Sequence, residues 1–264
     1  MFELTYGPFF TRNMLSILTA ISIFLIILTG CGAKPDPVRF ESFRERGIRL
    51  MVAGEYDKAV REFRKALKID DKDSRLYISM AECFEQLNES DSAVTYYEGA
   101  IIFNPGDSNP YQIIGDIYFE NQDYDEAMAW YDRAQQIGYL KPGSYIKLAK
   151  IHQNWNQFDF ASQYYTLAVA IDSSNIDGFY GLGLMKLMAA DTVMAEYNFL
   201  EAITKGPHAR AAYRLGLIRA ERKHYDEAIK YLDQCAQLEP DSDLGRQAYQ
   251  RRIEIIMKMK AGQE

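Results

Sequence analysis

Small and large apolar residues recur along this chain with a fixed period. Small residues fall at Gly47, Ala81, Gly115, Ala149, Gly183 and Gly216, thirty-four residues apart except for a last step of thirty-three. A second set keeps phase with the first: Ala59, Ala93, Ala127, Ala161, Ala195 and Ala228. Each of these alanines is followed at +4 by a large apolar or aromatic residue and at +7 by a small one. Because offsets of 0, 4 and 7 share one face of an α-helix, the pattern predicts a helix with a small, large, small stripe in every unit.

A second helix is expected in each unit, since turn signals divide the period in two. The segments AGEY (53–56) and NQDY (121–124) are typical turns between helices. Pro105, Pro207 and Pro240 follow second helices, which proline cannot continue. The period therefore predicts six units, at about residues 40–73, 74–107, 108–141, 142–175, 176–208 and 209–241.

The segments GEYDKAVREFRKAL (54–67), QDYDEAMAWYDRA (122–134) and HYDEAIKYL (224–232) resemble the tetratricopeptide repeat, or TPR. The resemblance covers about residues 40–241 and implies an all-α fold, an α-solenoid in which six helix-turn-helix units wind into a right-handed superhelix. Four positions depart from the pattern: Arg46 where it prefers leucine, Lys186 and Arg219 where it has an aromatic residue, and Ala190 in a turn. They affect the expected helix boundaries and leave the fold class unchanged.

Residues 242–264 are expected to form a capping helix and a tail. The stretch from Leu244 to Lys260 is amphipathic, with Leu244, Ala248, Ile255 and Met259 near one face. A solenoid needs an end cap with one polar side, so this segment is predicted to cap the last unit. Docking to a membrane surface or to a partner is the alternative.

The first thirty residues have the pattern of a signal peptide. Met14 to Leu28 is an apolar run of about fifteen residues, shorter than the roughly twenty that span a bilayer, and Arg12 supplies a positive region before it. Leu28-Thr29-Gly30-Cys31 resembles the lipobox of bacterial lipoproteins, which implies cleavage of residues 1–30 and attachment of acyl chains such as palmitate to Cys31. A simple N-terminal anchor helix is the alternative.

The residues after Cys31 bear on where the protein would be held. Gly32 follows the cysteine in place of an aspartate, and the lipoprotein resemblance then favours the outer membrane, facing the periplasm, in a source with two membranes. Residues 31–39 contain two prolines and no apolar periodicity, so they are predicted to be the lipidated cysteine and a short extended tether.

Composition and charge exclude several functions. The formal net charge of -7 argues against nucleic acid as a partner, because phosphate binding needs a basic stripe. Cys83 and Cys235 fall at helix-facing positions and are predicted to be buried, not bridged. The three histidines, His152, His208 and His224, are scattered, which favours surface or groove positions over a metal site. No nucleophile elbow, phosphate loop or metal cluster is recognisable, so no catalytic residue and no cofactor is expected, and the protein is predicted not to be an enzyme.

The TPR resemblance implies that the first helix of each unit lines a concave groove. Carried over residue by residue, the groove would be acidic in units two and three, at Glu82, Glu85, Asp116 and Glu120. In units five and six it would be apolar, at Tyr180, Leu184, Leu187, Met188, Tyr213 and Leu217. A solvated charged face is the alternative for the acidic set, and coverage by the terminal helix is the alternative for the apolar set.

Exposed apolar side chains in a concave surface are typical of partner sites. The leading hypothesis is therefore a membrane-anchored scaffold or adaptor that binds segments of envelope proteins and helps to assemble a complex of the bacterial envelope. In architecture the chain is similar to the pilotin-like lipoproteins of type IV pili. A module that binds a small ligand or cell-wall glycan through Tyr180 and Tyr213 is the alternative.

Overall fold

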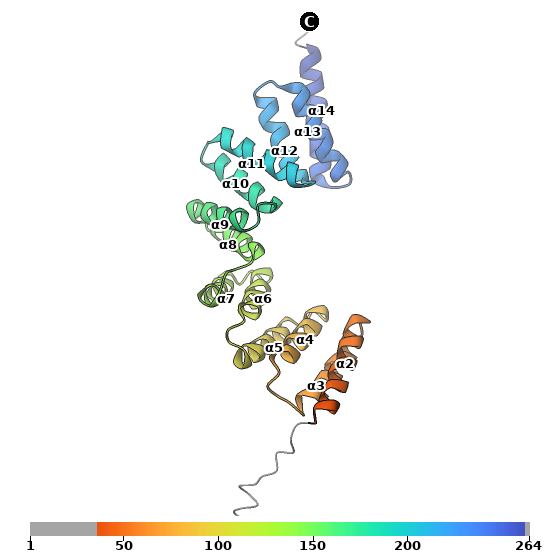
Figure 1. The fold of residues 1–264 in the computed structure, drawn as a ribbon. Coiled ribbons are helices and arrows are strands. Elements are labelled where there is room, and N and C mark those ends of the chain that lie inside the picture. Colours follow the sequence, from red (N-terminus) through yellow and green to blue (C-terminus); the bar gives the residue numbers. More distant parts are fainter. Residues whose placement is uncertain (1–35, 262–264) are drawn as a thin grey trace, which may run out of the picture. The chain divides into compact units, whose positions relative to one another are not determined.

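The computed structural model describes residues 36–261, and within that range it contains thirteen α-helices and no strands (Figure 1). The first helices of the repeats are α2 (Pro37–Val52), α4 (Ser74–Gln86), α6 (Ser108–Glu120), α8 (Pro142–Asn154), α10 (Ile176–Met188) and α12 (Ala209–Glu221). The second helices are α3 (Tyr56–Leu67), α5 (Ser90–Phe103), α7 (Tyr124–Ile137), α9 (Phe158–Ile171), α11 (Thr192–Lys205) and α13 (Tyr225–Leu238), and α14 (Asp243–Ala261) follows them. The chain divides into two compact parts, Met1–Glu89 and Ser90–Glu264, here called the N-terminal and C-terminal parts.

The N-terminal part contains α2, α3 and α4, and its first helix starts earlier than the sequence suggested. The Asp36 carboxylate accepts hydrogen bonds from the backbone N–H groups of Val38 and Arg39, both at 3.1 Å, and Pro37 takes the first helical position. An aspartate cap followed by proline is a strong start signal. Helix therefore begins at Pro37, three residues before the predicted start of unit one, and residues 37–39 do not belong to an extended tether.

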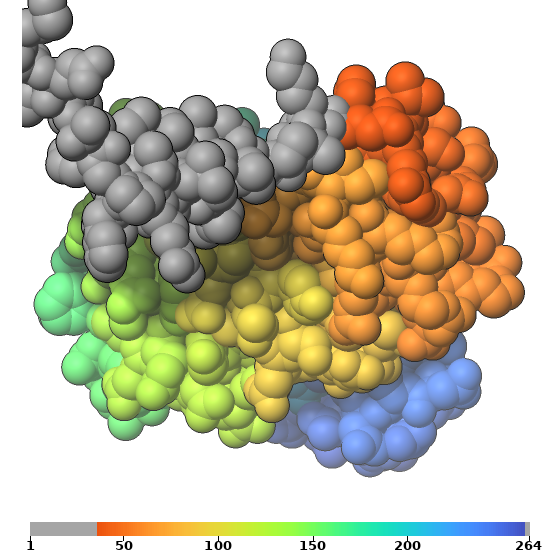
Figure 2. Space-filling model, turned by 90° about the horizontal axis from the view of Figure 1, so that it is seen from below, coloured from red at the N-terminus to blue at the C-terminus, as the bar shows by residue number. Residues whose placement is uncertain are grey.

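The helix pair of the first repeat exposes a basic surface. Helix α3 buries Ala59, Val60, Phe63 and Ala66 along one stripe. Its other side carries exposed cations, Lys58, Arg61, Arg64 and Lys65. This stretch of the surface is drawn in orange in Figure 2. The stripe is the one that the period predicted, because the buried positions are the small, large, small set.

The C-terminal part is a succession of helix pairs that ends in α14 (Figure 1). Helices α6, α8, α10 and α12 each pack against the helix that follows them, and each second helix from α5 onward also contacts the first helix of the next repeat. Helix α14 packs against α13 and α12, burying Ala248 and Ile255. The prediction of a TPR solenoid with a C-terminal capping helix is confirmed.

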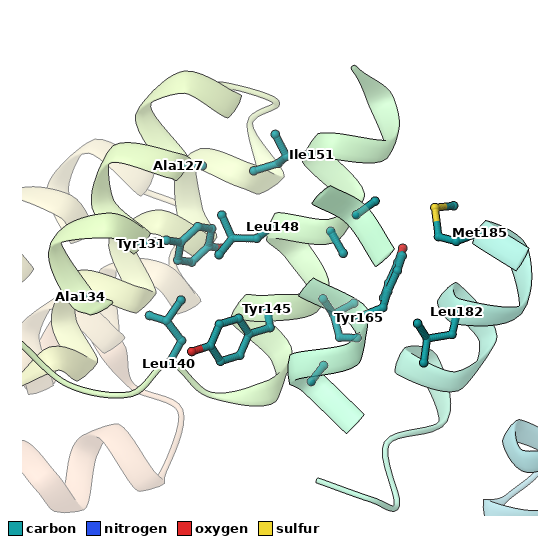
Figure 3. Packing of buried hydrophobic residues seen from close by; sticks show 14 of the residues in the cluster. Ala127, Tyr131, Ala134, Leu140, Tyr145, Leu148, Ile151, Tyr165, Leu182 and Met185 are labelled. Carbon is teal, nitrogen blue, oxygen red and sulfur yellow. The ribbon is translucent and has the colours of Figure 1, made fainter. Parts of the chain in front are cut away.

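The large residue of each stripe fills space within a repeat and between repeats. Tyr131 of α7 is fully buried and lies over Gly115 of α6, where an added Cβ would come within 2.7 Å of its ring. Tyr165 of α9 reaches the next repeat, since a Cβ on Gly181 of α10 would lie 2.3 Å from its ring. Figure 3 shows Tyr131 beside Leu148 and Tyr165 facing Leu182 and Met185. Small residues on the first helices are thus needed for the close approach of these rings.

The turn inside every repeat has the same backbone geometry. One residue in each has a positive φ, and these residues are Gly54, Asn88, Gln122, Asn156, Ala190 and Lys223. The next N–H donates to a carbonyl five residues earlier, for example Asp191 N to Lys186 O at 2.9 Å and His224 N to Arg219 O at 2.9 Å. This is a Schellman ending, which satisfies the last carbonyls of the first helix. It explains why the turn recurs with the period although only one of the six residues is glycine.

Proline and cysteine behave as the sequence indicated. Helices α5, α11 and α13 end at Phe103, Lys205 and Leu238, each two residues before a proline. Cys83 and Cys235 are free and fully buried. Burial raises the pKa of each thiol to about 11, so both are neutral at physiological pH.

Candidate partner-binding surface

The predicted signal peptide and Cys31 lie outside the described residues, so lipid attachment is not seen in the structure. In the range that the structure covers, none of the helices combines the length and apolar character that crossing a bilayer requires.

Two of the predicted acidic groove residues lie on α4 in the N-terminal part. Glu82 and Glu85 are one turn apart and both are half-buried. Burial raises the pKa of the Glu82 carboxyl, and the neighbouring Glu85 carboxylate raises it further. The two acidic residues predicted on this helix are therefore present, but the Glu82 carboxyl group loses its proton less readily than a carboxyl group in water.

The other two acidic residues, Asp116 and Glu120, lie on α6 in the C-terminal part and share a cation. The Lys147 ammonium of α8 is 3.1 Å from Asp116 Oδ1 and 3.4 Å from Glu120 Oε1. The buried Tyr131 hydroxyl also donates to Asp116 Oδ1, at 2.6 Å. Burial and the Asp116 carboxylate together raise the pKa of Tyr131, which keeps its hydroxyl a donor. Asp116 thus joins α6, α7 and α8, and much of its charge is already compensated inside the chain.

The apolar residues predicted on α10 fall into two groups. Tyr180, Leu184 and Leu187 are half-buried and pack against the cluster around Phe199 and Leu215. Met188 is 55% exposed and lies instead beside the first turn of α9, in a hollow lined also by Phe158 and Lys186. The structure therefore keeps three of the four residues on one stripe and places Met188 apart from them.

Tyr180 contacts a histidine that the sequence did not single out as its partner. The rings of Tyr180 and His208 are 4.6 Å apart between centroids. His208 Nδ1 accepts the backbone N–H of Ala211 at 3.0 Å and so caps α12, while Nε2 lies 3.6 Å from Asp177 Oδ1. The polar contact with this imidazole lowers the pKa of Asp177. The stripe on α10 is thereby joined to the start of α12.

Tyr213 and Leu217 of α12 face α14. Tyr213 lines a hollow of about 380 Å³ whose other walls come from α14. Leu217 lines a second hollow of about 170 Å³, also shared with α14. The terminal helix therefore leaves both residues accessible, and it adds polar side chains that the sequence prediction did not include, Arg246, Gln250, Arg251 and Lys258.

One departure from the repeat pattern, Arg219, is explained by neighbouring residues. Arg219, at the aromatic position of α12, pairs with the buried Glu196 of α11, and its Nε is 3.2 Å from Glu227 of α13. Arg222 also binds Glu196, at 2.5 Å. The charge of Arg219, which stands at an aromatic position of the repeat, is thus balanced by carboxylates on the two adjacent helices.

One histidine prediction is wrong. His152 is only 6% exposed, where a surface or groove position was predicted. Its ring stacks on Phe160 and Tyr164 at 5.3 and 5.2 Å, and Nδ1 is hydrogen-bonded to Gln157 Oε1 at 2.6 Å. It takes the place of an aromatic residue, since it follows Tyr118 by one period of thirty-four. The described residues contain no group of three or more His, Cys, Asp or Glu side chains that could hold a metal ion.

The comparisons with known proteins agree with this architecture. Family models described as tetratricopeptide repeat match residues 50–117, residues 108–137 and 142–175, and residues 209–242, which together are more than half of the chain. The chain belongs to the tetratricopeptide repeat family. A comparison with curated proteins found no match.

Several solved structures share the fold at low sequence identity. PilF of Pseudomonas aeruginosa has a TM-score of 0.68 at 18% identity, over 81% of this chain and 98% of that one. PilW, described as a widely conserved type IV pilus biogenesis factor, has a TM-score of 0.62 at 19% identity, over 80% and 98%. YrrB, described as a TPR protein with an unusual peptide-binding site, has a TM-score of 0.57 at 23% identity, over 71% and 97%. At these identities the likeness shows the fold.

Proposed function

We propose that this protein is a scaffold or adaptor that binds segments of partner proteins along the first helices of its repeats. The observation that carries the proposal is the row of half-buried apolar residues Tyr180, Leu184 and Leu187 on α10, continued on α12 by Tyr213 and Leu217. The first four contact the core clusters, Leu217 is half-buried, and all five are partly open to solvent, which is how a preformed binding surface is built. The peptide-binding description of YrrB, which has the same fold, supports this assignment.

We further propose that the protein is held at a membrane of the bacterial envelope through acylated Cys31, after cleavage of residues 1–30. The pilus biogenesis role printed for PilW supports a place in assembling an envelope complex. In a source with two membranes, the outer membrane facing the periplasm fits best. Changing Cys31 to Ser should leave the protein soluble or unprocessed, whereas unchanged processing and membrane fractionation would contradict the anchor.

Binding of a small ligand or glycan is less well supported. Tyr180, one of the two tyrosines on which that alternative rested, packs its ring against Phe199 and His208. Less of the ring is therefore available to stack on a sugar.

The scaffold proposal is tested by affinity capture from the organism's own membranes. The bait is the full-length protein, compared with a variant in which Leu184 and Leu187 are both changed to Glu. A matched variant, Leu167→Glu, places one charge on an exposed position of α9, a second helix. Envelope proteins captured by the unaltered bait and by Leu167→Glu, and lost from the double variant, are the expected result. Equal capture by all three would contradict binding along α10.

A further inference from the structure

The outer side of α3 carries a row of cations, here called the basic face. Its members are all exposed and come from the helix and its C-cap: Lys58, Arg61, Arg64, Lys65 and Lys68. Positions 58, 61, 65 and 68 are three or four residues apart, so they share one side of the helix, and position 64 lies next to them. The buried stripe of Ala59, Phe63 and Ala66 occupies the opposite side. The basic face therefore points away from the core of the first repeat.

Most of the charge on the basic face is available to a partner. Among the residues that the structure describes, Arg61, Arg64 and Lys68 have no ion-pair partner. Lys58 and Lys65 each pair with a glutamate three residues earlier, but their side chains are still 59% and 51% exposed. Exposed pairs of this kind are weak, so both ammonium groups can turn to another anion.

The first repeat differs in charge from the rest of the chain. Residues 37–68, which contain α2 and α3, hold nine basic and five acidic residues. Residues 69–264 hold nineteen basic and thirty acidic residues. An anionic surface therefore attracts the first helix pair and repels the chain that follows it.

The basic face also lies close to the predicted point of membrane attachment. Five residues, 32–36, separate Cys31 from Pro37, so the two are at most about 22 Å apart. Helix α3 runs back along α2, since the Lys65 ammonium is 5.7 Å from the centroid of the Phe43 ring in the second turn of α2. Charges act over only about 8 Å at physiological salt. An acyl anchor on Cys31 would hold the cations near the bilayer, where this short range suffices.

We propose that the basic face of α3 binds the anionic phospholipid headgroups of the membrane to which Cys31 is anchored. The guanidinium and ammonium groups pair with lipid phosphates, and acidic lipids strengthen the attraction. An acyl anchor and a basic patch together hold a protein at a membrane more firmly than either alone. The inference goes beyond partner binding and rests on the proposed anchor. The short tether favours lipid over an acidic partner protein, because it keeps these cations near the bilayer with or without a partner.

The test measures how close the basic face lies to lipid headgroups. The full-length protein is reconstituted into vesicles of phosphatidylcholine, alone or mixed with phosphatidylglycerol, that contain a trace of lipid with a quencher on its headgroup. A fluorescent dansyl amino acid is placed at Asp57, exposed in the first turn of α3, or at Lys230, exposed on α13. In the mixed vesicles we expect about threefold more quenching at position 57 than at position 230, and a loss of this excess in neutral vesicles or at high salt. Equal quenching at the two positions, or in the two kinds of vesicle, would overturn the proposal.

Variants locate the contact. The combined change Arg61→Glu, Arg64→Glu and Lys68→Glu should lower quenching at position 57 to its level in neutral vesicles. The matched control reverses three other exposed cations to glutamate and should leave that quenching unchanged: Lys230, Lys258 and Lys260. Circular dichroism checks the fold, and the corresponding glutamine variant replaces the reversal if the latter is unfolded. An equal loss of quenching in both triple variants would overturn the assignment to α3.

Three outcomes separate this inference from the anchor and from a protein partner. If the protein stays with neutral vesicles and quenching at position 57 does not depend on lipid charge, the anchor stands and the inference falls. If Cys31→Ser leaves processing and fractionation unchanged while quenching still requires the basic face, the acyl anchor falls and the lipid contact stands. If a poly-glutamate peptide binds the basic face while phosphatidylglycerol adds no quenching, the face is a site for an acidic protein segment and the proposal is overturned.

Discussion

The ring of Phe199 lies against Gly183, sixteen residues earlier, so closely that a methyl group on the glycine would come within 2.4 Å of Cε1. The same relationship joins Gly115 to Tyr131 and Gly216 to Leu232. In these repeats one large side chain of the second helix is therefore seated on one small residue of the first helix. The pair, with its spacing of sixteen residues, recurs with the thirty-four-residue period of the sequence.

Changing Gly183 to Ala should destabilise the protein by about 1–3 kcal/mol, the usual cost of overpacking a well-packed core. Gly143, in the first turn of α8, has no atom within 4 Å of an added Cβ and provides the matched control. Gly143→Ala should be neutral or stabilise by up to about 1 kcal/mol, because it reduces the freedom of the unfolded chain. Urea unfolding followed by circular dichroism measures both, and equal effects would contradict the close approach of Phe199.

The turn between α10 and α11 holds an alanine in the left-handed region. Ala190 has φ of 58°, a conformation that costs a residue with a Cβ about 1 kcal/mol or more. Ala190→Gly should therefore raise the free energy of unfolding by about 0.5–1 kcal/mol. Ala189, one residue earlier, has φ of -80°, so Ala189→Gly should lower it by a similar amount. A change of the same sign in both variants would show that the Schellman geometry is not formed there.

The carboxylate of Glu196 is expected to matter more than any surface charge in this region. Its side chain is 9% exposed and binds both Arg219 and Arg222. Glu196→Gln should cost about 2 kcal/mol of stability, since two cations lose their partner at a partly buried site. Glu227, which also contacts Arg219, is 55% exposed, and Glu227→Gln should cost less than about 1 kcal/mol. Thermal unfolding at low and high salt measures the stability of both variants. Equal losses of stability in Glu196→Gln and Glu227→Gln would contradict the burial of Glu196.

The two buried cysteines should be inert in the folded protein. With the pKa of each thiol raised to about 11, the reactive thiolate is nearly absent below pH 9, and both side chains are closed to solvent. In the Cys31→Ser variant, Cys83 and Cys235 should react with a thiol reagent only after denaturation. The denatured protein should then consume two equivalents of the reagent, one for each thiol. Rapid reaction of either thiol in native buffer at pH 7 would contradict its placement.

The fold was predictable because it follows from a spacing. Small residues such as Gly115 and large ones such as Tyr131 repeat in phase, and stacking of identical helix pairs is the arrangement that buries every stripe. The start of α2 was missed because its cap is out of phase with the repeats: Asp73 and Asp107 cap α4 and α6 one period apart, whereas Asp36 precedes Asp73 by thirty-seven residues. His152 was misplaced although its phase with Tyr118 would have indicated a buried ring.

The candidate surface was only partly predictable. Residues on a single helix, such as Tyr180 and Leu184, follow from the repeat register. The pairing of Asp116 with Lys147, the contact of Tyr180 with His208, and the hollows shared by α12 and α14 depend on side chains of neighbouring repeats, whose distances the period alone does not give. Arg219 shows this limit most clearly. In the sequence it departs from the repeat pattern, and only the structure shows that it pairs with the buried Glu196.

The central claim is that partner segments bind along the first helices of the repeats. Site-specific photo-cross-linking tests it most directly, with a benzoyl-phenylalanine residue placed in turn at Leu184, Leu217 and Leu167 of the full-length protein in living cells. We expect light-dependent adducts with the same envelope protein from Leu184 and Leu217, and none above background from Leu167, which is exposed on a second helix. Adducts from Leu167 alone, or none from either groove position, would contradict the account.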